Sequence, residues 1–186
     1  MANLPGIAFF AAIVLTLVVV VVAWFDLRER RIPNLIVFPA ALIGLGLNVV
    51  QGWDGLWFGV KGLLLGLALL FVPHLLGAMG AGDVKFLAAI GAFVGGTGVI
   101  RVLLLSLMVY PVLALGFLLQ QRKLTLTLRR FARLTSKLFG VFIPPLRFYA
   151  AQLEARDNPE EASATTPFGL AITIGTLLAL YTNFLR

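Results

Sequence analysis

The chain has 186 residues, of which 60% are hydrophobic and only 12% are charged, and its mean hydropathy is +1.00. This composition excludes an ordinary soluble domain and is typical of a membrane protein. The length fits one compact unit, so we expect a single polytopic membrane domain over 1–186 with any chemistry placed among the spans. The chain has no cysteine and a single histidine, which excludes thiolate chemistry and argues against a histidine-built metal centre. We expect no metal, no cofactor and no nucleic-acid partner.

A helix that crosses a bilayer needs about 20 apolar residues, and six apolar runs approach that length. They lie at 6–25, 35–50, 56–76, 84–100, 102–119 and 167–185. The sequence therefore predicts an all-α integral membrane protein with six transmembrane helices. The first run lacks the basic start and the small-residue cleavage site of a removable signal peptide, so we expect it to be retained.

Positive charge is concentrated in alternate connections between these runs. Twelve of the 15 Lys and Arg residues follow the first, third or fifth run, namely Arg28, Arg30, Arg31, Lys85, Arg122, Lys123, Arg129, Arg130, Arg133, Lys137, Arg147 and Arg156. Lys61, Arg101 and Arg186 lie on the other side. The positive-inside rule predicts that the three basic connections are cytoplasmic and that both termini lie outside.

The longest connection, 120–166, has two parts. Within 128–142, apolar and basic residues separate onto opposite sides at helical spacing, which predicts a cytoplasmic amphipathic helix in the headgroup layer. The basic segment 122–147 would then bind anionic lipid headgroups, and a solvated basic loop is the alternative. The string EARDNPEEASATTP that follows is typical of a flexible linker, and Thr166 and Pro167 are expected to begin the last helix.

Few ionisable residues lie in or beside the spans, where burying a charge is costly. They are Asp26, Asp54, Lys61, His74, Asp83, Lys85 and Arg101. We interpret Asp54, Lys61 and Arg101 as snorkelling residues at outer helix ends, and His74 as a solvated side chain near an inner end.

Asp26 and Asp83 differ from these because the predicted topology puts both at the cytoplasmic face. Contact between the first and fourth spans would bring the two carboxylates together. Each also has a simpler explanation, since Asp83 suits a helix N-terminus and Asp26 can pair with neighbouring arginines. Gly80 and Gly82, just before Asp83, permit close approach of another chain.

Glycine spacing predicts where spans pack tightly. Gly62 with Gly66, and Gly91 with Gly95, are separated by three residues, the GxxxG spacing that lets two membrane helices approach closely. We expect these four glycines to serve helix packing.

Three segments combine the candidate residues in a fixed order along the chain. They are DLRERRIPN at 26–34, GAGDVKFLAAIGAFVG at 80–95 and TPFGLAI at 166–172. With these segments the chain resembles the type IV prepilin peptidases, membrane aspartyl peptidases with a Gly-x-Gly-Asp motif. Within that family it is similar to the short, single-domain form of tight-adherence pilus systems.

The resemblance implies an aspartyl endopeptidase that removes the basic leader from type IV pilin-like precursors at the cytoplasmic face of the bacterial inner membrane. Asp26 and Asp83 would be its catalytic aspartates. Residues in substrate-binding or supporting roles would be Gly80, Gly82, Lys85, Pro33 and Asn34. Longer members carry an N-terminal domain with paired cysteine motifs and are described as also methylating the new pilin N-terminus. Because this chain lacks cysteine, we expect no methyltransferase activity.

Hydrolysis by two carboxylates needs one ionised group to take a proton from water and one protonated group to polarise the carbonyl. Two neighbouring aspartates supply both states, since their mutual repulsion favours a single shared proton. We expect the glycine-rich segment 77–82 to receive a locally unwound stretch of substrate.

Two other functional classes stay open. Paired carboxylates in a membrane can also serve a cation transporter or channel subunit, although the outer halves of the spans are nearly all aliphatic, which counts against a continuous ion path. A non-enzymatic assembly factor of a secretion or pilus system is the other class, and it would tolerate neutral replacement of either aspartate.

Overall fold

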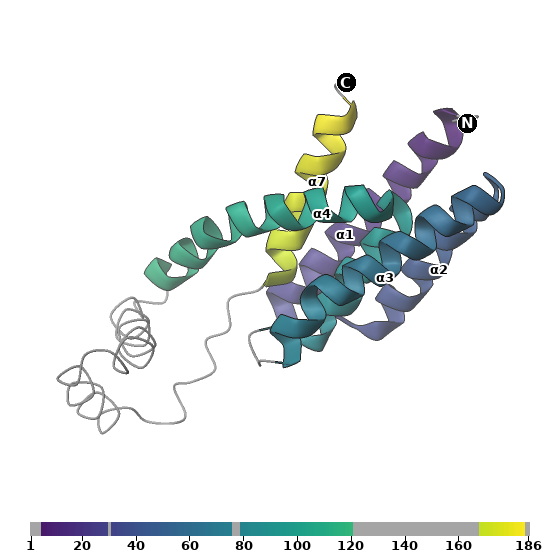
Figure 1. Ribbon diagram of the computed structural model, residues 1–186. Helices are drawn as coiled ribbons and strands as arrows, with labels where there is room; N and C mark the ends of the chain where they lie inside the picture. Colours follow the sequence, from purple (N-terminus) through teal and green to yellow (C-terminus); the bar gives the residue numbers. More distant parts are fainter. Residues whose placement is uncertain (1–4, 30, 76–78, 121–167, 185–186) are drawn as a thin grey trace, which may run out of the picture. The chain divides into compact units, whose positions relative to one another are not determined.

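The computed structural model describes residues 5–29, 31–75, 79–120 and 168–184. Over these ranges all elements are helices: α1 (Pro5–Glu29), α2 (Asn34–Val49), α3 (Trp53–Leu75), α4 (Ala81–Gln120) and α7 (Phe168–Phe184) (Figure 1). The predicted all-α class is therefore confirmed for the described part of the chain. The predicted amphipathic helix, the basic segment 122–147, the linker and the start of the last helix at Thr166 and Pro167 lie outside the described residues.

The described residues belong to two compact units. The first contains the described residues as far as Tyr110 together with α7, and the second contains Pro111–Gln120, the last part of α4. All the candidate site residues that the sequence indicated lie in the first unit.

Among the described residues, three helical stretches are long and apolar enough to cross a bilayer, namely Gly6–Glu29, Trp53–Leu75 and Ala81–Phe117. α2 and α7 are also apolar but shorter. Large apolar side chains such as Leu17, Phe71 and Leu104 are exposed on these helices, as expected of surfaces that face lipid tails. These features are those of a membrane protein built from helices.

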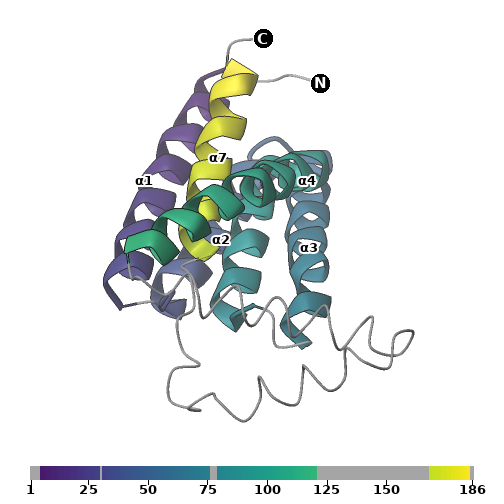
Figure 2. The ribbon, with the colours of Figure 1, turned by 90° about the vertical axis from the view of Figure 1, so that its left-hand side faces the viewer.

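The helices of the first unit pack in neighbouring pairs. α1 contacts α7 and α2, and α2 contacts α3. The buried Thr173 hydroxyl of α7 donates a hydrogen bond of 3.1 Å to the carbonyl of Val19 in α1, which satisfies a polar group inside an apolar interface. Figure 2 shows the C-terminal ends of α1 and α3 and the N-terminal ends of α4 and α7 at the same end of this unit.

Glycines bring the backbones of α3 and α4 into direct contact. A methyl group at Gly62 would overlap the carbonyl oxygen of Gly91, and one at Gly66 would lie 2.7 Å from the carbonyl oxygen of Leu87. Both α3 glycines are buried. The GxxxG prediction is thus confirmed for Gly62, Gly66 and Gly91, whose missing side chains let the two helices touch.

Gly95, the remaining glycine of those pairs, breaks α4. Its φ is 71° and its ψ is −176°, a conformation that glycine adopts without the cost paid by other residues. The predicted boundary between the spans 84–100 and 102–119 was wrong, because the break comes at Gly95 and Arg101 lies within the helical stretch that follows. Arg101 is exposed, so its charge did not require a helix end.

Candidate active site

Asp26 lies in the last turns of α1 and is buried, with 5% of its surface exposed. One carboxylate oxygen, Oδ2, accepts a hydrogen bond of 2.9 Å from the backbone N–H of Leu170. Leu170 is in the first turn of α7, where backbone N–H groups have no partner within the helix. Asp26 therefore caps α7 from another helix, and its charge is favourable at the positive end of the helix dipole.

Gly169 explains how α7 comes so close to Asp26. A methyl group at this position would lie 2.7 Å from Asp26 Oδ2 and 2.9 Å from Ile32 Cδ1. Both distances are shorter than a carbon contact tolerates, so a larger residue at position 169 would have to displace the ends of the Asp26 and Ile32 side chains. The sequence singled out the segment 166–172 without assigning it a role, and the structure shows that its glycine lies against the first aspartate.

Asp83 lies in the first turn of α4 and is partly buried. Its Oδ2 accepts a hydrogen bond of 3.3 Å from the backbone N–H of Gly80, the residue just before the helix. A side chain at the third helical position that reaches back to this N–H forms half of a capping box. The sequence suggested that Asp83 suits a helix N-terminus, and the structure places it two residues inside that end.

The structure brings Asp26 and Asp83 to the same end of the first unit. Asp26 lies near the C-terminal end of α1 and Asp83 near the N-terminal end of α4, and these two helix ends lie together in Figure 2. A connection through one side chain is also visible, since Ile32 contacts Gly169 beside Asp26. At its other end Ile32 lies against Gly82, where a methyl group would be 3.1 Å from Ile32 Cβ.

Lys85 is held on the neighbouring helix rather than by Asp83. Its Nζ donates a hydrogen bond of 3.2 Å to Asn34 Oδ1 and lies 5.6 Å from the centroid of the Phe38 ring. Asn34 begins α2 directly after Pro33, which occupies the N-cap position. Lys85, the fifth residue of α4, thus joins this helix to the first residue of α2, and the predicted supporting residues Pro33, Asn34 and Lys85 lie at one junction.

His74 and the other ionisable residues lie in different surroundings. His74 is partly buried, and its Nδ1 donates a hydrogen bond of 3.0 Å to the carbonyl of Met79, which ties the end of α3 to the residues before α4. Asp54, Lys61 and Arg101 are exposed. Within the described ranges, no three His, Cys, Asp or Glu side chains gather in a group that could hold a metal ion.

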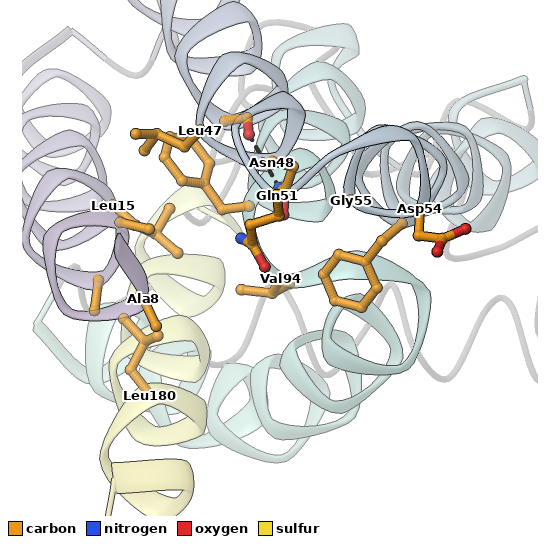
Figure 3. A pocket seen from close by; sticks show the side chains of 14 residues that line it. Ala8, Leu15, Leu47, Asn48, Gln51, Asp54, Gly55, Val94 and Leu180 are labelled. Atoms are coloured by element: carbon orange, nitrogen blue, oxygen red, sulfur yellow. Dashed lines mark hydrogen bonds between the residues drawn. The ribbon is translucent and has the colours of Figure 1, made fainter. Parts of the chain in front are cut away.

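A cavity of about 470 Å³ lies at the opposite end of the helices (Figure 3). Its lining includes Ala8 and Leu15 from the N-terminal half of α1, whereas Asp26 lies at the C-terminal end of that helix. Figure 3 shows Gln51 projecting between the helices and Asp54 projecting away. Neither Asp26 nor Asp83 lines this cavity, so it is separate from the candidate active site.

Two residues at the site were not found from the sequence. The sequence indicates Ile32 only as part of the segment 26–34, and Leu170 only as part of 166–172. Both act through contacts between distant parts of the chain, one through an apolar side chain and the other through a backbone N–H. The one available signal was their position inside the two segments that carry the family resemblance.

Comparison with known proteins relates the sequence of this chain to a family. The model of the Type IV leader peptidase family matches residues 13–119, a range that contains both aspartates. The curated "Prepilin leader peptidase/N-methyltransferase" of Aeromonas salmonicida strain A449 is 34% identical over 122 residues, which cover 62% of this chain and 42% of that protein. The protein of the same name from Aeromonas hydrophila gives the same identity and coverage.

The protein of that name from Xanthomonas campestris pv. campestris is 36% identical over 115 residues, covering 56% of this chain and 39% of its own length. The chain thus matches less than half the length of these relatives. No solved structure gives a significant match. The family match extends over more than half of the chain, and the chain belongs to the type IV leader peptidase family.

Proposed function

We propose that this protein is a membrane-embedded aspartyl endopeptidase that removes the basic leader peptide from type IV pilin-like precursors. The observation that carries the proposal is the placement of Asp26 and Asp83 at one end of the unit, where Ile32 lies against both Gly169, beside Asp26, and Gly82, beside Asp83. Membership of the leader peptidase family supports the same reaction. The relatives' printed names refer to prepilin, which supports a pilin-like precursor as the substrate class.

In the proposed reaction the two aspartates hold one proton between them. The ionised carboxylate takes a proton from water, and the protonated one polarises the scissile carbonyl and then gives its proton to the leaving amine. Repulsion between the two charges favours this half-protonated state. Because Asp83 and Gly80 lie at the start of a helix, with Gly80 exposed, water and an extended peptide can reach the same point.

Gly80 and Gly82 are proposed to receive the substrate. A helical precursor must unwind before its peptide bond can be cut, and the unwound strand needs backbone hydrogen-bond partners. Among the described residues, a would-be Cβ at Gly80 meets only Asp83 Oδ2, at 3.4 Å, and the backbone nitrogen of Gly82, at 4.0 Å. This leaves space for a second strand next to the carboxylate.

For the membrane arrangement we propose a single polytopic domain with six spans, in which α4 supplies two that join at Gly95. The basic connections would be cytoplasmic, with both termini outside, so that cleavage occurs at the cytoplasmic face of the bacterial inner membrane. The basic segment 122–147 would lie on anionic lipid headgroups. We propose peptidase activity alone for this chain, without methyl transfer.

The proposal is tested by co-expression with several candidate precursors, following loss of the leader by gel shift. Wild type should shorten a precursor, whereas Asp26→Asn and Asp83→Asn should leave it uncut at the same membrane level of the enzyme. Asp54→Asn, which changes an exposed aspartate, is the matched control and should cleave normally. Cleavage by both site variants would show that the two aspartates are not the catalytic groups, and failure of the wild type on every precursor would overturn the proposal.

A further inference from the structure

We infer that Ile32 is a positioning residue that sets the separation between the Asp26 and Asp83 carboxylates. The inference rests on the proposed function, because it concerns the geometry of the two acids in that reaction. It is carried by contacts of one side chain with two glycines, each of which adjoins one of the aspartates.

The first contact is at α7. The Cδ1 end of Ile32 would lie 2.9 Å from a methyl group at Gly169, and the same methyl would lie 2.7 Å from Asp26 Oδ2. Ile32 and the Asp26 carboxylate therefore share the space left free by this glycine. Asp26 also accepts a hydrogen bond from the next residue of α7, Leu170. A shift of α7 relative to Ile32 would therefore also move the Asp26 carboxylate.

The second contact is at α4. The Cβ of Ile32 would lie 3.1 Å from a methyl group at Gly82, and Cγ1 would lie 3.6 Å from it. Gly82 precedes Asp83 directly, and Asp83 is fixed locally by its hydrogen bond with Gly80. The Cβ of Ile32 thus limits how closely the start of α4 can approach residue 32. The Cδ1 of the same side chain limits how closely the start of α7 can approach it.

The residues around Ile32 keep this side chain in place. Proline restricts the backbone of the residue before it to extended conformations, so Pro33 restricts the backbone conformation of Ile32. A β-branched side chain has few rotamers, which makes isoleucine a stiff spacer. Asn34 is held to α4 by Lys85, so the segment from Ile32 to Asn34 is tied to the helix that carries Asp83.

A graded series at Ile32 tests the spacer role with purified enzyme and purified precursor. Ile32→Ala removes the contacts of Cγ1 and Cδ1, and we expect kcat to fall by up to about 100-fold because a displacement of about 1 Å suffices for that loss. KM should change less than about twofold. Ile32→Val keeps the base of the side chain and loses only Cδ1, so its kcat should be intermediate.

Leu35→Ala is the matched control. It removes a similar aliphatic side chain three residues further along the chain, in the first turn of α2, but Leu35 is 85% exposed and its loss should leave kcat unchanged. Thermal unfolding in detergent separates positioning from folding, since the Tm of Ile32→Val should stay within a few degrees of wild type. A fall in kcat that merely follows the loss of folded protein across the series would overturn the inference.

A pair of double variants tests the two contacts separately. Gly169→Ala should slow cleavage, and Ile32→Val should restore part of the rate because it removes Cδ1, one of the two groups that the new methyl meets. Gly82→Ala should also slow cleavage, but Ile32→Val should not restore it, since Cβ remains. If Ile32→Val restored both glycine variants equally, or restored neither, the assignment of Cδ1 to the contact with Gly169 and of Cβ to the contact with Gly82 would be wrong.

These outcomes are distinct from failure of the proposed function. If wild type cleaves no precursor, the peptidase proposal itself fails. If wild type cleaves and Ile32→Ala cleaves with an unchanged kcat, the peptidase proposal stands and the spacer role is rejected.

Discussion

The carboxylate of Asp26 accepts a hydrogen bond of 2.9 Å from the backbone N–H of Leu170, across 144 positions of the chain. A candidate catalytic group therefore also caps the last described helix. Its two roles use different properties of the same side chain. Capping needs an acceptor oxygen, whereas the proposed chemistry needs an acid that can gain and lose a proton.

Replacement of Asp26 should separate these two roles. Asp26→Asn keeps an oxygen that can accept from Leu170, so we expect the Tm to stay near that of wild type while cleavage is lost. Asp26→Ala removes the cap, and it should lower the free energy of unfolding by about 0.5–2 kcal/mol as well as abolish cleavage. Thermal unfolding in detergent and the gel-shift assay measure the two effects.

The exposed Asp54, in the first turn of α3, is the control for both variants. Asp54→Ala should cleave as wild type does and should show a smaller change in Tm than Asp26→Ala. If Asp26→Asn lowers the Tm as much as Asp26→Ala, the hydrogen bond to Leu170 requires the charge and the simple separation of roles is wrong.

Lys85 and Asn34 should behave as one unit. Lys85→Met keeps most of the side-chain length but removes the donor to Asn34 Oδ1, and Asn34→Ala removes the acceptor. Each should cost at most about 1 kcal/mol in unfolding free energy, because the bond is exposed to solvent. The double variant should cost little more than either single one, and Lys61→Met, at an exposed lysine of α3, should cost nothing measurable. Additive losses would show that the two side chains act independently.

The opposite end of the unit offers a variant that should change stability without changing chemistry. Asn48 is buried in α2, and its Nδ2 donates to the carbonyls of Gly44 at 3.0 Å and of Ala92 at 2.8 Å. Asn48→Ala leaves the Ala92 carbonyl of α4 without this donor, which should cost about 1–2 kcal/mol.

Cleavage per folded molecule should stay unchanged in Asn48→Ala, since Asn48 lies near the cavity and away from the aspartates. Gln51→Ala, at an exposed neighbour, should alter neither property. A selective fall of kcat in Asn48→Ala would show that the two ends of the unit are coupled.

How far the sequence could predict this site depends on the kind of contact. Asp26 and Asp83 could be assigned to one end because charge distribution predicted the alternation of the helices, and helix direction follows from that alternation. The hydrogen bond from Leu170 could not be predicted, since a backbone N–H leaves no trace in residue identity. Ile32 was equally invisible, because an isoleucine in an apolar chain does not reveal which two glycines it separates.

Helix packing and helix boundaries likewise include features that the sequence could predict and features that it could not. The tight packing of Gly62 on Gly91 followed from spacing alone, since GxxxG acts through the absence of side chains. The break at Gly95 did not, because the same glycine spacing fits both a continuous helix and a positive φ. The boundary was predicted at Arg101 because this residue is a charge between two apolar runs. An exposed arginine can nevertheless lie within a helix and extend its charged group outward.

Close packing of α3 on α4 gives a prediction for the fold alone. A methyl group at Gly62 would overlap the carbonyl oxygen of Gly91, which belongs to the backbone and cannot rotate away. Gly62→Ala should therefore force the two helices apart and lower the free energy of unfolding by about 1–3 kcal/mol. Gly46→Ala is the matched control, because a methyl at Gly46 meets nothing within 4 Å and alanine favours the helix by about 0.5–1 kcal/mol. The two variants should shift the Tm in opposite directions when unfolding is followed in the same detergent. A Tm for Gly62→Ala at or above that of wild type would show that α3 and α4 are not held at this distance.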